Sequence, residues 1–99
     1  MSNKFSELIN NETPTLVDFS AEWCGPCKMM KPILEDLKSK MGEKVTIIKI
    51  DVDKNLNVSS IYRIQGVPTL ILFKKGEIKW RESGVQSAAQ LEKIITSYA

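Results

Sequence analysis

Trp23-Cys24-Gly25-Pro26-Cys27 lies where a strand pattern gives way to a helix pattern. The residues before it, Thr15–Ser20, are apolar on both faces of the expected strand, which is typical of a central strand covered on both sides. After it, apolar residues recur at helical spacing as far as Met41, and Gly42 is expected to end that helix. We therefore expect the two cysteines at the junction between a buried strand and the first turn of a long helix.

The rest of the chain alternates predicted helices and strands with short connections. A short first helix, capped by Ser2 or Asn3, precedes the first strand. Further strands are expected at 45–51, 69–73 and 77–83, with a short helix within 53–64 and a last helix starting at the capping box Ser87-Ala88-Ala89-Gln90. Two strands separated by a helix are parallel through a right-handed crossover, whereas the hairpin around Gly76 is antiparallel. The predicted fold class is therefore α/β, with a mixed sheet and helices on both faces.

Length and composition indicate one domain over residues 1–99. Lys and Arg total 14 against 12 Asp and Glu, without a long run of like charges, which argues against nucleic-acid and polybasic membrane partners. No apolar stretch approaches the roughly 18 residues of a membrane span. Residues 1–7 lack the apolar core of a signal peptide, so the expected location is the reducing cytoplasm, and we expect a monomer.

The chain has two cysteines and no histidine, so Cys24 and Cys27 must carry most of its chemistry. Zinc needs four ligands and only carboxylates would remain to complete its site, so no metal is expected. A structural disulfide across so short a loop would add little stability, and two inert buried cysteines are a further alternative. A redox pair is favoured, because this spacing beside a strand–helix–strand pattern is typical of thiol–disulfide exchange.

The start of a helix favours a reactive thiolate. Its unpaired N–H groups and the positive end of the helix dipole lower the pKa of a cysteine at the cap. Cys24 is therefore expected to be the accessible nucleophile, whereas Cys27, one turn further in, is expected to be shielded. Pro26 suits the first turn because it has no N–H to lose, and Gly25 allows another chain to approach closely.

Several motifs accompany the cysteines at fixed spacing: Leu-Val-Asp-Phe at 16–19, Ala-Glu-Trp-Cys-Gly-Pro-Cys-Lys at 21–28, Pro32, Lys49, Asp51, Gly-Val-Pro-Thr at 66–69, Phe73, Lys74, Gly76 and Gly84. Together they resemble the thioredoxin family over nearly the whole chain. The resemblance implies a thioredoxin fold. Family members usually carry another strand before the first helix, which the short segment ahead of Cys24 leaves missing or vestigial. We therefore expect about four strands, with a barer edge at Val45–Asp51.

The resemblance also implies roles for residues outside the pair. Asp18 would be buried beneath Cys27 as its base, with a pKa raised by burial; on the pattern alone, an aspartate facing solvent at a strand end is the alternative. Lys49 would be the partner of this acid, although a solvated lysine fits the pattern nearly as well. Pro68 would be a cis-proline opposite the cysteines, and Pro32 would kink the long helix.

A flat apolar rim around Cys24 is implied as the substrate-binding surface. Its residues would be Trp23, Gly25, Pro26, Gly66, Val67, Pro68 and Gly84. The backbone of Val67 would pair with the substrate as an added strand. Such a surface suits diverse disulfide-containing proteins better than one small molecule.

The implied reaction is the reduction of a disulfide in another protein. Cys24 attacks the substrate disulfide, and Cys27 then resolves the mixed disulfide, which leaves Cys24 and Cys27 oxidised. No bound cofactor is expected; NADPH would supply electrons through a thioredoxin reductase. A reductant is favoured because no cation lies between the cysteines. A glutathione-dependent, glutaredoxin-like reductase and a non-catalytic binding subunit are the alternatives.

Overall fold

The computed structural model describes residues 4–99, so the expected caps Ser2 and Asn3 lie outside the described residues. Helices and strands follow in the predicted order, and the short 3-10 helix η1 is the one addition among them. The elements are α1 (Lys4–Leu8), β1 (Thr15–Ser20), α2 (Gly25–Met41), η1 (Gly42–Lys44), β2 (Thr46–Asp51), α3 (Leu56–Ile61), β3 (Thr69–Lys74), β4 (Glu77–Ser83) and α4 (Ala88–Ser97).

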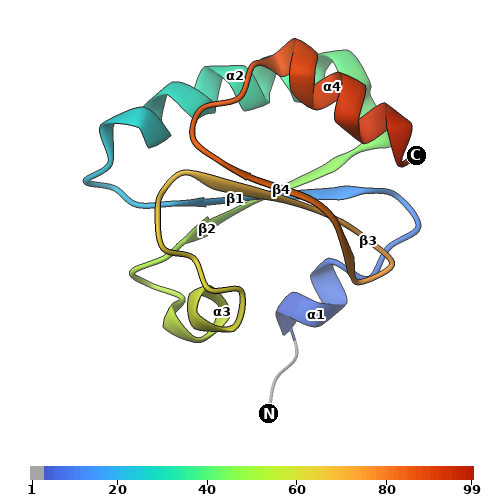
Figure 1. The fold of residues 1–99 in the computed structure, drawn as a ribbon. Helices are drawn as coiled ribbons and strands as arrows, with labels where there is room; N and C mark the ends of the chain where they lie inside the picture. Colours follow the sequence, from blue (N-terminus) through green and yellow to red (C-terminus); the bar gives the residue numbers. More distant parts are fainter. Residues whose placement is uncertain (1–3) are drawn as a thin grey trace.

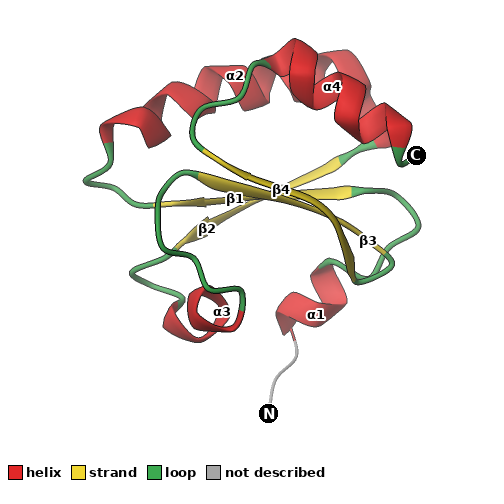
Figure 2. Ribbon diagram, viewed as in Figure 1, coloured by secondary structure: helices red, strands yellow, loops and turns green. Residues whose placement is uncertain are grey.

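The strands form one mixed sheet in the order β2-β1-β3-β4. β1 and β2 are parallel, whereas β3 is antiparallel to both β1 and β4. α2 and α4 cover one face of the sheet, and α1 and α3 cover the other (Figure 1). Figure 2 shows the strands as a single twisted layer between these helices. The predicted four-stranded mixed sheet is confirmed, and within residues 4–99 β2 lies at its edge.

Local sequence signals determine several ends of these elements. Gly42 adopts a φ of 57° and its N–H bonds to the carbonyl of Lys38, which ends α2 as expected. The Ser87 hydroxyl accepts a hydrogen bond of 3.1 Å from the N–H of Gln90, which caps α4. Lys75 and Gly76 both have positive φ angles, the backbone that a two-residue hairpin turn requires.

β1 lies in the middle of the sheet and every one of its residues is buried. Its Leu16 packs with Met30 and Leu37 of α2 on one face, and its Phe19 joins an aromatic cluster with Phe5 on the other. Each such side chain contributes roughly 1.5–3 kcal/mol by burial. Because β1 is packed on both faces, it holds Asp18 inside the protein. It also fixes the position of the cysteines, which follow it in the chain.

Candidate active site

Cys24 and Cys27 form a disulfide at the start of α2, with their Cα atoms 5.3 Å apart. Cys24 is the N-cap residue, and its sulfur accepts a hydrogen bond of 3.1 Å from the N–H of Cys27. The sulfur therefore occupies the place that a serine or aspartate oxygen takes at other helix starts. After reduction, the same N–H and the helix dipole favour a thiolate on Cys24.

The expected difference in exposure between the cysteines is wrong, because each is only 4% exposed. Ala21, Val52 and Val67 pack against the pair. The sulfur of Cys24 lies 3.6 Å from the carbonyl oxygen of Val67. In the disulfide this is a packing contact, because the sulfur carries no hydrogen. In the reduced protein, a Cys24 thiol could donate a hydrogen bond to the Val67 carbonyl. Sequence spacing did not reveal that the segment at Val67 would cover Cys24.

The peptide bond between Val67 and Pro68 is cis, as predicted. Two hydrogen bonds hold this segment at the end of the sheet. The Thr69 hydroxyl donates to the carbonyl of Gly66 at 2.6 Å, and the N–H of Gly84 donates to the carbonyl of Pro68 at 2.8 Å. These contacts place Val67 beside Cys24 and attach it to the segment that follows β4.

The predicted rim residues differ in exposure. Trp23, Gly25, Pro26 and Gly66 are exposed, Val67 and Gly84 are half-buried, and Pro68 is buried. The Trp23 side chain is 71% exposed, and its Nε1–H donates to the Asp53 carboxylate at 2.9 Å. Asp53 was not predicted as a site residue; it lies 30 residues further along the chain, and no local pattern links the two.

Asp18 is buried in β1, with 1% of its surface exposed. Its Oδ1 has no hydrogen-bond partner among the residues that the structure describes. Burial raises the pKa of Asp18 to about 6, and the positive charge of Lys49 partly opposes this shift. Lys49 lies opposite Asp18 in the register of β1 and β2. The alternative of a solvent-facing Asp18 is therefore wrong. Lys49 is exposed to solvent, and its charge also acts on Asp18.

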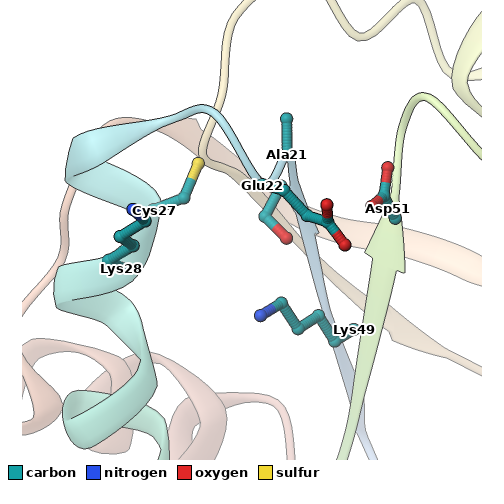
Figure 3. Close-up of a pocket in the computed structure, with 7 residues that line it drawn as sticks. Ala21, Glu22, Cys27, Lys28, Lys49 and Asp51 are labelled. Atoms are coloured by element: carbon teal, nitrogen blue, oxygen red, sulfur yellow. The ribbon is translucent and has the colours of Figure 1, made fainter.

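A cleft of about 500 Å³ opens beside Cys27. It is lined by Ser20, Ala21, Glu22, Cys27, Lys28, Lys49 and Asp51. Figure 3 shows the side chain of Lys49 extending from β2 toward α2, with its nitrogen directed away from the Glu22 and Asp51 carboxylates. Lys49 also lines a second cavity together with Asp18, so it borders both spaces. Pro32 lies further along α2 and is exposed.

Comparison with known proteins gives the family of this chain. The thioredoxin family model matches residues 1–97. The chain belongs to the thioredoxin family. Its thioredoxin-like relative in Synechocystis sp. is 49% identical over 88 residues, which are 88% of this chain and 84% of that protein. The thioredoxin of Acidithiobacillus ferridurans is 41% identical over 92 residues, which are 93% and 85% of the two chains.

The thioredoxin fold is shown by a solved structure as well. A thioredoxin variant from Halobacterium salinarum superposes with a TM-score of 0.87 at 37% identity, covering 99% of this chain and 85% of its own. With a redox-active cysteine pair in this family, the chain is an oxidoreductase that reduces disulfides. Residues 4–99 contain no group of three or more side chains suited to hold a metal ion. No helix in that same range is long and apolar enough to cross a membrane.

Proposed function

We propose that the chain works as one thioredoxin domain, over residues 1–99, in which Cys24 is the nucleophile and Cys27 is the resolving cysteine. The observation that carries these roles is the position of the Cys24 sulfur at the cap of α2, where the Cys27 N–H donates to it at 3.1 Å. Only Cys24 has this stabilisation, so it is the sulfur that is present as a thiolate in the reduced protein.

The reaction then proceeds in two exchanges. The Cys24 thiolate attacks one sulfur of the substrate disulfide, which releases the other sulfur as a thiolate and forms a mixed disulfide. Cys27 loses its proton and attacks Cys24, which releases the second substrate sulfur and forms the Cys24–Cys27 disulfide. The substrate gains two electrons and the protein loses two, so the disulfide must be reduced again before the next cycle.

Asp18 is the proposed base for Cys27. Its pKa of about 6 is closer to that of a thiol than the pKa of an ordinary aspartate, so it exchanges protons with Cys27 more readily. Lys49 stabilises the ionised form of Asp18 from the neighbouring strand. The chain has no histidine to compete for this role. Pro32 lies inside α2, where its missing N–H should kink the helix, and it takes no part in the exchange.

The substrate binds across the rim around Cys24. Trp23, Gly25, Pro26, Gly66 and Gly84 supply the contact surface, and the backbone of Val67 beside the cis Pro68 pairs with an extended stretch of substrate. The 3.6 Å contact between Val67 and the Cys24 sulfur supports this assignment, because it brings the pairing backbone to the reacting atom. Main-chain pairing reads no particular side chain, so diverse disulfide-containing proteins can bind.

Electrons come from NADPH through a thioredoxin reductase, and the protein itself binds no cofactor or metal. It acts in the cytoplasm as a monomer, without nucleic-acid or membrane partners. The exchange of electrons with a reductase uses the same pair of cysteines, which is the redox centre that the protein carries.

Reduction of insulin disulfides with dithiothreitol tests this function. The unsubstituted protein should accelerate the precipitation of insulin B chain, and the Cys24→Ser, Cys27→Ser double variant should not. Equal rates for the two proteins would favour a binding subunit with incidental cysteines. Assays of the oxidised protein with NADPH and a thioredoxin reductase, or with glutathione, distinguish a thioredoxin from a glutaredoxin-like enzyme.

A further inference from the structure

A second cavity, of about 230 Å³, lies between α2 and β2. Among the residues that line it, Asp18 and Leu34 are buried, whereas Lys31, Glu35 and Lys49 are exposed. The cavity therefore leads from the buried carboxyl to the protein surface. It lies further along α2 than the cleft at Cys27, and Lys49 lines both.

The buried carboxyl of Asp18 needs a hydrogen-bond partner that residues 4–99 do not provide at Oδ1. Its buried Oδ1 has none among residues 4–99, and an unsatisfied buried oxygen costs about 1–3 kcal/mol. Oδ1 itself is closed to water, but Asp18 lines the cavity, so water there can meet the rest of its side chain. Each water occupies about 30 Å³ and needs two to four polar neighbours. The cavity has room for several molecules, and Glu35 and Lys49 supply further polar groups along its wall.

The cavity is separate from the surface on which a substrate would bind. None of the rim residues proposed above lines it, and neither cysteine does. A protein bound over Cys24 would therefore leave the cavity open. This matters for the second exchange, because Cys27 has to lose its proton while the substrate is still attached.

We propose that the cavity between α2 and β2 is the passage through which Asp18 exchanges its proton with solvent while a substrate is bound over Cys24. This inference rests on the proposed role of Asp18 as the base. The Cys27 thiol gives its proton to the Asp18 carboxylate, and the resulting acid gives it to water in the cavity. The substrate sulfur leaves as a thiolate, and the protein releases the Cys27 proton to solvent through the cavity, so the covered face is not used.

The charges at the passage also define what can enter it. Lys49 faces Asp18 from β2, and Lys31, Glu35 and Lys38 line the cavity from α2, while the β3 residue opposite Asp18 is the neutral Leu70. Three cations and one carboxylate favour the entry of small anions over small cations. A small carboxylate can therefore reach the place of the Asp18 side chain when that side chain is removed.

Chemical rescue tests the passage. A mixed disulfide of Asp18→Ala with a peptide from insulin B chain should release the peptide slowly, and formate should accelerate the release roughly tenfold, part of the roughly 10²–10⁴-fold that positioned acid–base catalysis supplies. In the Asp18→Ala background, Ile47→Phe fills the passage and should abolish rescue by formate. Ile47→Ala widens the passage and should extend rescue to the larger propionate.

Two substitutions of exposed residues complete the test, and neither changes the packing of the core. Lys31→Glu at the passage should raise the formate concentration needed for half-maximal rescue several-fold. Glu22→Trp, at the cleft beside Cys27, is the matched control and should leave rescue unchanged. Rescue that is lost in Glu22→Trp but kept in Ile47→Phe and Lys31→Glu would overturn the passage, because the acid would then enter through the cleft.

The proposed function and this inference fail in different ways. If Asp18→Ala releases the peptide as fast as the unsubstituted protein, Asp18 is not the base and no passage to it is needed. The other failure is slow release in Asp18→Ala, with no acceleration by formate in that variant or in the double variant Asp18→Ala, Ile47→Ala. Asp18 then remains the base, but the proposal of a passage is wrong.

Discussion

The N–H of Cys27 donates a hydrogen bond of 3.1 Å to the sulfur of Cys24. Both cysteines are 4% exposed, so their different roles do not come from exposure. They come from the helix: Cys24 caps it and receives the N–H, whereas Cys27 lies within the first turn and supplies it. A thiolate is stabilised at the first position and not at the second.

Removal of one cysteine at a time should therefore have different results. Cys27→Ser keeps the N–H that stabilises Cys24, so it should attack a substrate disulfide and accumulate the mixed disulfide. Cys24→Ser should accumulate none, because Cys27 lacks this stabilisation. Non-reducing gels and mass spectrometry after incubation with oxidised insulin measure the adduct. Accumulation in Cys24→Ser and not in Cys27→Ser would reverse the two roles.

Asp18→Asn should stabilise the oxidised protein at neutral and alkaline pH. The pKa of Asp18 rises from 3.8 to about 6 on folding, so the folded state holds this proton more tightly than the unfolded state. The resulting stabilisation is complete below pH 3.8 and is lost as the pH rises through about 6. At about 1.4 kcal/mol for each pKa unit, ionised Asp18 costs about 3 kcal/mol at pH 8, which asparagine avoids.

Urea unfolding of the oxidised proteins between pH 3.5 and pH 8 measures this effect. The difference between Asp18→Asn and the unsubstituted protein should grow across the pH range and level off above pH 7. Asp36→Asn is the control, because Asp36 is an exposed residue of α2 whose carboxylate pairs with Lys40 at 3.4 Å. A pH-independent difference for Asp18→Asn would show that its charge does not set the stability.

Asp53→Ala should loosen Trp23 without affecting the exchange chemistry. The Trp23 ring is 71% exposed and its Nε1–H has the Asp53 carboxylate as partner at 2.9 Å. Loss of a bond worth about 1 kcal/mol should raise the KM for insulin roughly fivefold with little change in kcat. Fluorescence anisotropy of Trp23 should fall, measured with Trp80→Phe so that one tryptophan remains. An unchanged anisotropy would mean that packing alone orients the ring.

Arg63→Gly should stabilise the fold by about 1 kcal/mol, because Arg63 has a φ of 54°, where a side chain is strained and glycine is not. Arg81 holds this backbone in place by donating to the carbonyls of Tyr62 and Arg63. Thermal unfolding checks the gain. Arg63→Ala removes the same side chain but keeps a Cβ, so it should give no comparable gain; equal stabilisation by both would point to the lost charge instead of the backbone.

The fold could be predicted from the sequence where each decision depends on nearby residues. The cap at Ser87, the helix end at Gly42 and the turn at Gly76 each involve contacts a few residues apart, and the structure has all three. The strand pattern of Thr15–Ser20 likewise predicted a covered central strand. The cis bond at Pro68 was different, because only the family resemblance predicted it.

The site could be predicted only in part, because its contacts join distant segments. Cys24 lies against Val67 across 43 residues and Trp23 bonds to Asp53 across 30, and neither contact has a sequence pattern. The burial of Cys24 was predicted wrongly for this reason. The contacts of Arg81 have no sequence pattern either, since its acceptors are backbone carbonyls that any residue would present.

The sequence by itself determined the order of the elements, the position of the cysteine pair at a helix start and the absence of histidine. These follow from residue type and from periodicity along the chain. Only the tertiary structure decided that both cysteines are covered, that Asp18 Oδ1 has no partner among residues 4–99 and that a cavity lined by Asp18 and Lys49 opens to the surface. Burial and cavities depend on how separate segments pack, and packing is what raises the pKa of Asp18.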